Sequence, residues 1–171
     1  TGGMHIDGLS DTSDAFLSGK SRDEMLIVMR DPHIGVMGAI SIISILLLKI
    51  GLLGAVAAPL KTTALLLACV LSRWSSVLTM FLFSYARKDG KAKVFMQGMN
   101  LKIFVLSSIM VLVFAFAIWR LKGILALLIV AGCTYLGSKF ASRKIGGITG
   151  DTLGAAIELT EIVTLFMVCI G

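Results

Sequence analysis

Residues 36–58 read VMGAISIISILLLKIGLLGAVAA, an apolar run with one charged side chain, Lys49, and with Pro59 directly after it. The core of a lipid bilayer is crossed by about 20 apolar residues of helix, with about 17 as a lower limit. The run is long enough to cross a membrane as a single helix. It therefore predicts an integral membrane protein and not a water-soluble domain.

The remainder of the chain has the same character. Of its 171 residues, 57% are hydrophobic and 15% are charged, whereas a soluble domain has about 45–50% and about 25%. Four more apolar stretches approach the length of a span, at 63–85, 103–119, 123–138 and 152–170. We predict an all-α fold, a polytopic integral membrane helical bundle with about five transmembrane helices. Residues 1–171 are expected to form a single membrane domain, in which a cytoplasm-facing acidic motif segment (1–35) precedes the helical bundle (36–171).

The basic residues between the spans are divided unequally. Eleven lysines and arginines lie in 1–35, 86–102 and 139–151, and three lie in the alternate connections. Positively charged loops tend to stay on the cytoplasmic side of a membrane. These three segments are therefore predicted to be cytoplasmic and the C-terminus external. No basic patch is interleaved with aromatic residues, so no nucleic-acid partner is expected.

Acidic residues are concentrated near the two ends of the chain, which hold nine of the ten. In the first cluster, Asp7, Asp11 and Asp14 fall within about 60° of one another on a helix. Like charges this close repel. A divalent cation such as Mg²⁺, which prefers carboxylate oxygens and commonly takes phosphate oxygens too, would remove that repulsion. A solvated acidic surface is the alternative. Gly8, between these aspartates, would let a ligand approach the backbone closely.

The second cluster follows a glycine-rich turn, GGITG, just before the last apolar stretch. Backbone N–H groups at such a helix start can cradle phosphate. On the helix that follows, Asp151 and Glu158 lie within about 20° of each other and Glu161 about 60° further round. Ionisable residues in a span are costly and indicate a functional site. The alternatives are helix capping by Asp151 and pairing of either glutamate with Lys49 or Arg73.

Between the two clusters, residues 29–35 read MRDPHIG. Arg30 and His33, just before a span, would hold phosphate or pair with the acids, and Asp31 lies beside them. A lone histidine is as often structural. His5 falls on the opposite side of the helix from the three aspartates, or else on a preceding turn beside a phosphate.

Three motifs together resemble the cobalamin 5′-phosphate synthase family, the integral-membrane adenosylcobinamide-GDP ribazoletransferases. They are TGGMHIDGLSDTSD at 1–14, the stretch 29–39, and GGITGDTLGAAIELTE at 146–161, in the right order and spacing. The sequence departs from the family pattern at Ala15, at Pro32-His33, where Ser-Arg is common, and at Ile148. A histidine at 33 is a weaker phosphate ligand than an arginine. Chains of the family are longer at the N-terminus, so an opening portion with further membrane segments is expected to be missing here.

The resemblance implies an Mg²⁺-dependent phosphoryl transfer in cobalamin assembly, from adenosylcobinamide-GDP to α-ribazole or α-ribazole 5′-phosphate, with release of GMP. Such a reaction needs in-line positioning, neutralised phosphate charge and a base for the attacking hydroxyl. The expected substrate-binding residues are His5, Gly8, Arg30, Asp31, His33, Gly146, Gly147, Thr149 and Gly150. The expected Mg²⁺ ligands are Asp7, Asp11, Asp14, Asp151, Glu158 and Glu161. Asp14 is predicted to be the catalytic base.

The implied setting is the bacterial inner membrane, crossed several times, with the active site facing the cytoplasm. The partners are then the two substrates and the lipid bilayer. A homo-oligomer and other late cobalamin-assembly enzymes are further candidates.

Two other functions compete with this hypothesis. A CDP-alcohol phosphotransferase also uses spaced aspartates on membrane helices, but its motif has Ala-Arg shortly after Asp-Gly, whereas Leu9-Ser10 follows Gly8 here. A cation transporter would bind its ion through carboxylates near the middle of the bilayer, often in repeated halves. Most acids here are predicted at one face and no internal repeat is visible, so phosphoryl transfer is favoured.

Overall fold

The computed structural model describes residues 2–87 and 89–171. Its helices are α1 (Met4–Phe16), α2 (Arg22–Val28), α3 (Val36–Ala55), the short 3₁₀ helix η1 (Ala58–Leu60), α4 (Lys61–Leu82), α5 (Lys91–Gly98), α6 (Leu101–Ile145) and α7 (Gly150–Ile170). Within the described residues, four helical segments are long and apolar enough to cross a membrane: Val36–Ala55, Ala58–Leu82, Leu101–Ile145 and Gly150–Ile170. The prediction of an all-α, polytopic membrane bundle is confirmed.

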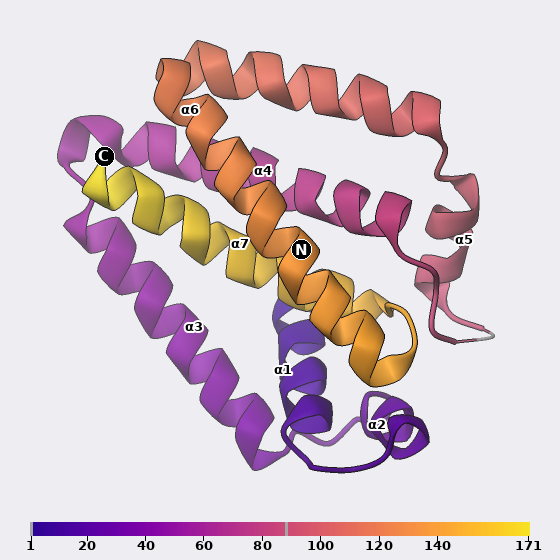
Figure 1. The fold of residues 1–171 in the computed structure, drawn as a ribbon. Coiled ribbons are helices and arrows are strands. Elements are labelled where there is room, and N and C mark those ends of the chain that lie inside the picture. Colours follow the sequence, from indigo (N-terminus) through magenta and orange to yellow (C-terminus); the bar gives the residue numbers. More distant parts are fainter. Residues whose placement is uncertain (1, 88) are drawn as a thin grey trace.

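Helix α6 contains two of the predicted spans, 103–119 and 123–138. Its backbone leaves the helical conformation at Trp119 (φ −138°) and Arg120 (φ 51°), and the chain turns back sharply there (Figure 1). The two halves approach closely beside the turn, because a Cβ atom on Gly123 would lie 2.0 Å from the carbonyl oxygen of Ala115. With α6 folded back, the four apolar helices supply five crossing segments, in agreement with the predicted number.

The first span ends before the apolar run 36–58 does. Helix α3 ends at Ala55, and Val56 already has an extended backbone. Pro59 lies instead in the first turn of η1, a position where the missing N–H of proline costs nothing because that group has no helical partner. The proline therefore begins the next helical segment and does not end the previous one.

Helix α7 is the central element of the bundle and packs against α1, α3, α4 and α6 (Figure 1). The largest cluster of buried side chains joins α4, α6 and α7 and includes Leu67, Leu71, Val130 and Val168. By contrast, α3 and the first half of α6 expose many large apolar side chains, among them Ile43, Leu47, Leu106 and Ile109. A helix that is apolar on its outer face is stable when that face meets lipid, which fits the membrane assignment.

The connections gather at two ends of the bundle. At one end, Arg22 Nε donates to the carbonyl oxygen of Ile145 (3.0 Å), and Lys144 Nζ donates to that of Phe16 (3.0 Å). Tyr85 and Ile148 form an isolated parallel β-bridge at the same end. At the other end, Lys122 Nζ donates to the carbonyl oxygen of Gly171. The segments predicted to share the cytoplasmic side therefore do share one end of the molecule.

The acidic motif segment is not separate from the bundle. Helix α1 packs against α7 and α3, and Figure 1 shows it below α7, between α3 and α2. Within the described part of this segment, 2–35, α2 and the loops beside it lie at the end of the bundle. Residues 4–16 are thus an integral part of the helical packing.

Candidate functional site

The acidic face of α1 is held against the start of α7 by two glycines. A Cβ atom on Gly8 would lie 2.7 Å from the carbonyl oxygen of Asp151, and one on Gly154 would lie 3.2 Å from the Cα of His5. Without side chains at these positions the two helix backbones can approach closely. Gly8 was predicted to admit a ligand, but the close neighbour in the structure is the backbone of α7.

Four aspartates lie together as a result, and they are called the acid cluster below: Asp7, Asp11 and Asp14 on α1, and Asp151 on α7. Burial, followed by the negative charges of the other three, raises the pKa of Asp11 to about 7. A carboxyl surrounded by like charges is harder to ionise. The structure thus brings the start of the second predicted cluster, Asp151, next to the first.

The acid cluster has the right donor chemistry for a hard cation, although its side chains do not converge on one point. Within residues 2–87 and 89–171, no three His, Cys, Asp or Glu side chains are grouped closely enough to hold a metal ion as they stand. Carboxylate oxygens are nevertheless the ligands that Mg²⁺ prefers, with water and substrate oxygens completing its octahedron. At Asp11, burial and then the neighbouring carboxylates raise the pKa, and a bound cation would offset the second of these causes.

Asp14 differs from the other members of the acid cluster because both of its oxygens are already engaged. Oδ2 accepts the backbone N–H of Gly35 at 2.7 Å, and Oδ1 accepts that of Gly38 at 2.8 Å. These N–H groups belong to the start of α3, where a carboxylate satisfies donors that have no helical partner and interacts well with the helix dipole. This arrangement favours a positioning role for Asp14 over the predicted role of catalytic base.

Arg87 is a site residue that sequence reasoning missed. Its Nη2 lies 3.1 Å from Asp151 Oδ2, and its side chain is only 11% exposed. Its Nε is buried and makes no hydrogen bond to any described group. In the sequence it is one of eleven basic residues in the connections, and no spacing rule distinguishes it from the others. Its position follows from backbone pairing between the loop before it and the turn before α7.

That turn, at 146–149, is built largely for packing. Gly146 has φ +75°, and a Cβ atom on Gly147 would lie 2.6 Å from the carbonyl oxygen of Ser84. The N–H of Ile148 donates to the carbonyl oxygen of Ser84 (2.9 Å), and the N–H of Thr149 donates to Thr152 Oγ1 (2.8 Å). The predicted phosphate cradle therefore has several of its N–H groups committed within the protein, and Thr149 acts as the cap of α7.

Glu158 and Glu161 point away from the acid cluster into an ion-pair network between three spans. Lys49 Nζ on α3 lies 2.5 Å from Glu158 Oε2 and 2.6 Å from Glu161 Oε2, and Arg73 on α4 also pairs with Glu161. Charged groups in a membrane are stable when paired. The pairing alternative is therefore the observed one, and neither glutamate is presented to the acid cluster as a free ligand.

The remaining predicted substrate residues are dispersed. His33 is exposed, and its Nδ1 lies 2.6 Å from Asp31 Oδ1. The backbone and side-chain hydrogen bonds from His33 lower the pKa of Asp31, so these two residues form a local pair in the loop. Arg30 donates to the backbone carbonyl of Asp89 at 3.3 Å.

His5 lies deeper in the bundle, near the packing contact with Gly154. Its Nδ1 is buried without a hydrogen-bond partner in the described part of the chain. Burial, and then the positive charge of Arg73, lower the pKa of its imidazole. His5 thus lies between the acid cluster and the ion-pair network.

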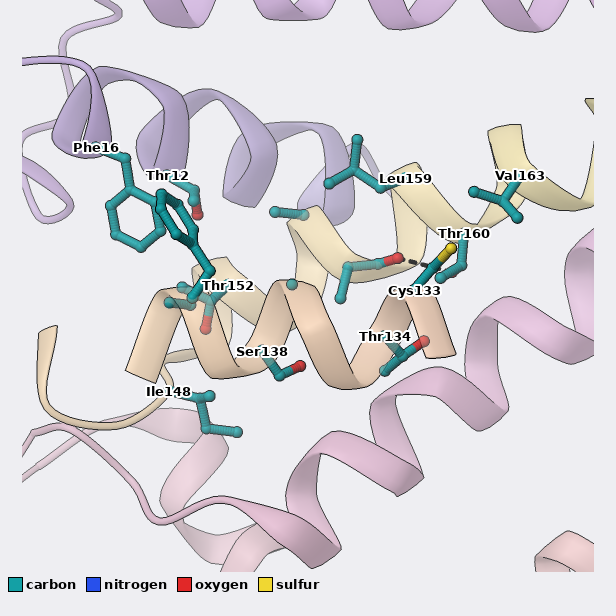
Figure 2. A pocket seen from close by; sticks show the side chains of 15 residues that line it. Thr12, Phe16, Cys133, Thr134, Ser138, Ile148, Thr152, Leu159, Thr160 and Val163 are labelled. Carbon is teal, nitrogen blue, oxygen red and sulfur yellow. Dashed lines mark hydrogen bonds between the residues drawn. The ribbon is translucent and has the colours of Figure 1, made fainter. Parts of the chain in front are cut away.

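An apolar pocket of about 190 Å³ lies beside the acid cluster, between α1, α6 and α7 (Figure 2). Thr12, the neighbour of Asp11 on α1, lines it together with Thr134 and Ser138 of α6. The hydroxyls of Thr12 and Thr134 are buried without hydrogen-bond partners among the described residues. The rest of the lining is mostly apolar, which suits an apolar group better than a phosphate.

Comparisons with known proteins place this chain among named relatives. A family model described as Cobalamin-5-phosphate synthase matches residues 1–169. Curated proteins named adenosylcobinamide-GDP ribazoletransferase are similar to it. The Roseiflexus sp. (strain RS-1) protein is 41% identical over 96% of this chain and 61% of its own length. The Desulforamulus reducens protein is 34% identical over 100% and 69%, and that of Escherichia coli (strain K12) is 36% identical over 96% and 68%. The chain thus spans about two thirds of the length of these relatives. No solved structure matches it.

Proposed function

Because this chain belongs to the cobalamin-5-phosphate synthase family, we propose that it catalyses the joining of adenosylcobinamide-GDP to α-ribazole or α-ribazole 5′-phosphate. The observation that carries the proposal is the family match over residues 1–169, together with an acid cluster formed by its two most acidic motifs. The relatives' shared name, adenosylcobinamide-GDP ribazoletransferase, supports the same reaction.

In this reaction a hydroxyl oxygen of the ribazole ribose forms a new bond to the phosphorus that is attached to cobinamide. The bond from that phosphorus to the oxygen bridging the two phosphates breaks, and GMP leaves with the bridging oxygen. The hydroxyl proton passes to a base. Phosphoryl transfer depends mainly on positioning and on neutralising charge, so the protein must hold a diphosphate beside acids that can bind a cation and accept a proton.

We assign the cation site to Asp7, Asp11 and Asp151, whose carboxylates would hold Mg²⁺ together with water and substrate oxygens. Bound there, Mg²⁺ would neutralise charge on the diphosphate. Asp14 and Glu161 are left out of this set because both of their oxygens are engaged, and Glu158 because it belongs to the ion-pair network. Asp151 is kept because only its Oδ2 is engaged, by Arg87 and Thr149.

The proton acceptor is assigned to Asp7 or Asp11. Unlike Asp14, neither of them accepts a hydrogen bond from another described residue, so a carboxylate oxygen remains available for the ribose hydroxyl. Asp14 then acts as a positioning residue that joins α1 to the start of α3.

We also propose that the end carrying the acid cluster faces the cytoplasm of a bacterial inner membrane, because eleven lysines and arginines lie in the connections at this end. The competing transporter hypothesis is not favoured. Its intramembrane carboxylates would need to be free for an ion, whereas Glu158 and Glu161 are paired with Lys49 and Arg73.

The experiment is an assay of GMP release from adenosylcobinamide-GDP and α-ribazole 5′-phosphate, with the protein in lipid nanodiscs and with or without Mg²⁺. We expect Asp7→Asn, Asp11→Asn and Asp151→Asn each to lower turnover by a factor of about 100 or more, because a lost charged ligand weakens transition-state stabilisation by several kcal/mol. Asp89→Asn, an exposed acid at the same end, is the matched control and should retain activity. Near-normal turnover in all three cluster variants would contradict the assignment.

A further inference from the structure

A second pocket, with a polar lining, opens at the same end of the molecule as the acid cluster. Three arginines line it, Arg22 on α2, Arg30 in the connection to α3 and Arg87 in the connection after α4; its volume is about 300 Å³. Asp23 is the acid in its lining, and Leu26 and Ile27 form an apolar side. It is called the arginine pocket below. Of these three basic residues, only Arg30 is expected from the sequence to bind a ligand.

The arginines converge because of long-range backbone contacts. The N–H of Ala86 donates to the carbonyl oxygen of Ile148 (2.8 Å), and the N–H of Ile148 donates to the carbonyl oxygen of Ser84 (2.9 Å). These bonds fix the loop that carries Arg87 against the turn before α7. Arg22 is held over the same turn, since its Nε donates to Ile145 (3.0 Å). The pocket is thus assembled from three distant segments.

The charges of Arg22 and Arg30 are poorly neutralised, whereas Arg87 is paired with Asp151. Arg22 and Arg30 each donate to a backbone carbonyl, at 3.0 Å and 3.3 Å, and a carbonyl carries no net charge. A guanidinium has five N–H donors, so both keep donors for another partner. Three positive side chains against one aspartate give the lining an excess of positive charge.

Arg87 carries the clearest indication of a ligand. Its Nη2 pairs with Asp151, but its Nε is buried and makes no hydrogen bond to the described residues, and the side chain is only 11% exposed. Leaving a buried donor without a partner is costly. The planar fork of a guanidinium matches the oxygens of a phosphate group, which accept two N–H bonds at once.

We propose that the arginine pocket binds the phosphate of the guanine nucleotide, the part of the substrate that leaves after transfer. Arg87 both lines this pocket and pairs with Asp151 of the acid cluster. It therefore lies at the boundary between the site of bond breaking and the site that retains the nucleotide phosphate. This inference rests on the proposed function for the identity of the nucleotide.

The test measures binding without turnover. GMP and, separately, guanosine are titrated by calorimetry into the chain in phosphatidylcholine nanodiscs, without ribazole. We expect GMP to bind at least about tenfold more tightly than guanosine. Arg22→Gln and Arg30→Gln should each lower the affinity for GMP by about tenfold or more, which is the contribution of one charge-assisted hydrogen bond. Arg143→Gln, an exposed arginine near the same end, is the control and should bind GMP as the wild type does.

Arg87 is tested by two variants, because removing a buried charge beside Asp151 can disturb folding. Arg87→Lys keeps the positive charge and loses the fork, and we expect it to weaken GMP binding while elution as a single folded species is retained. Equal affinity for GMP and guanosine, or GMP affinity that is unchanged in Arg22→Gln, Arg30→Gln and Arg87→Lys, would overturn the proposal.

A phosphate of a lipid headgroup has the same chemistry, so a second arm uses nanodiscs that contain phosphatidylglycerol. If the pocket takes a lipid, GMP will fail to bind in phosphatidylcholine and the arginine variants will lose preference for phosphatidylglycerol, which refutes the nucleotide. The experiments also distinguish failure of the proposed function from failure of nucleotide binding in the arginine pocket. Arginine-dependent GMP binding with no GMP release from adenosylcobinamide-GDP would count against the proposed function only, whereas full activity without arginine-dependent binding would count against this pocket only.

Discussion

Among individual residues, Asp11 shows most clearly how the fold makes a negative charge unfavourable in a place where a bound cation would stabilise it. It is partly buried and lies near Asp7, Asp14 and Asp151, and its pKa is raised to about 7. A raised pKa means that the folded state holds the proton of this carboxyl more tightly than the unfolded state does. Stability linked to this group is therefore fully present at low pH and is lost as the pH rises from about 4 to about 7.

This linkage predicts that Asp11→Asn stabilises the protein at pH 8 in the absence of divalent cations. Because Asp11 is only partly buried and solvent screens its charge, we expect a gain of about 1 kcal/mol, less than the full shift would give. The thermal midpoint in detergent, followed at pH 5 and pH 8, is the measurement, and the gain should shrink at pH 5. Asp89→Asn serves as the exposed control. A gain of the same size at both pH values would show that the charge of Asp11 is not the cause.

At the level of helices, the packing of α1 on α7 positions the acid cluster. Gly8 and Gly154 remove the side chains that would keep the two backbones apart, and the carbonyl oxygen of Asp151 lies directly against Gly8. The closeness of Asp7 and Asp11 to Asp151 is therefore a consequence of helix packing. Any residue that widens this packing contact should separate the acids as well as loosen the fold.

We therefore predict that Gly8→Ala lowers both stability and turnover. Its new Cβ would lie 2.7 Å from a backbone oxygen that cannot rotate away, so the helices must separate, at a cost of about 1–3 kcal/mol. Gly51→Ala on α3 is the matched control, because nothing lies within 4 Å of its Cβ position; it should be neutral or gain up to about 1 kcal/mol from helix propensity. Thermal midpoints and GMP release are compared for both. Equal behaviour of the two variants would refute the close approach of α1 and α7.

At the level of the whole molecule, the described parts of the three basic connections, 1–35, 86–102 and 139–151, lie at one end together with the acid cluster and the arginine pocket. Charged nucleotide substrates are cytoplasmic, so the proposed function requires this end to face the cytoplasm. The turn at Trp119–Arg120 and the end of α7 then face outward. A test of the membrane orientation is therefore also a test of the proposed function.

Single cysteines placed at the two ends should show this orientation. In a chain with Cys69, Cys133 and Cys169 replaced by alanine, a membrane-impermeant maleimide added to intact cells is expected to label Leu121→Cys and to leave Ser18→Cys unlabelled. Both positions are exposed, and both should react once the cells are permeabilised. Labelling of Ser18→Cys in intact cells would reverse the orientation and contradict the cytoplasmic site.

The helical class, the spans and the turn inside α6 could be read from the chain because they depend on local properties. A helix in lipid satisfies its own backbone hydrogen bonds and presents apolar side chains, so hydropathy along the sequence is enough to locate it. The gap between the apolar stretches 103–119 and 123–138 marked the turn at Trp119 and Arg120 in the same way. Helical spacing likewise placed Asp7, Asp11 and Asp14 on one face.

What lies opposite each face could not be read, because the direction of a side chain about its own helix does not say which helix packs there. Asp14 proved to face the start of α3, Glu158 to face Lys49, and Gly8 to face the backbone of α7. Arg87 is harder still to foresee, since a loop residue has no periodicity. It reaches Asp151 because backbone hydrogen bonds join the loop after α4 to the turn before α7, a contact between segments that are distant in sequence and adjacent only once the bundle has packed.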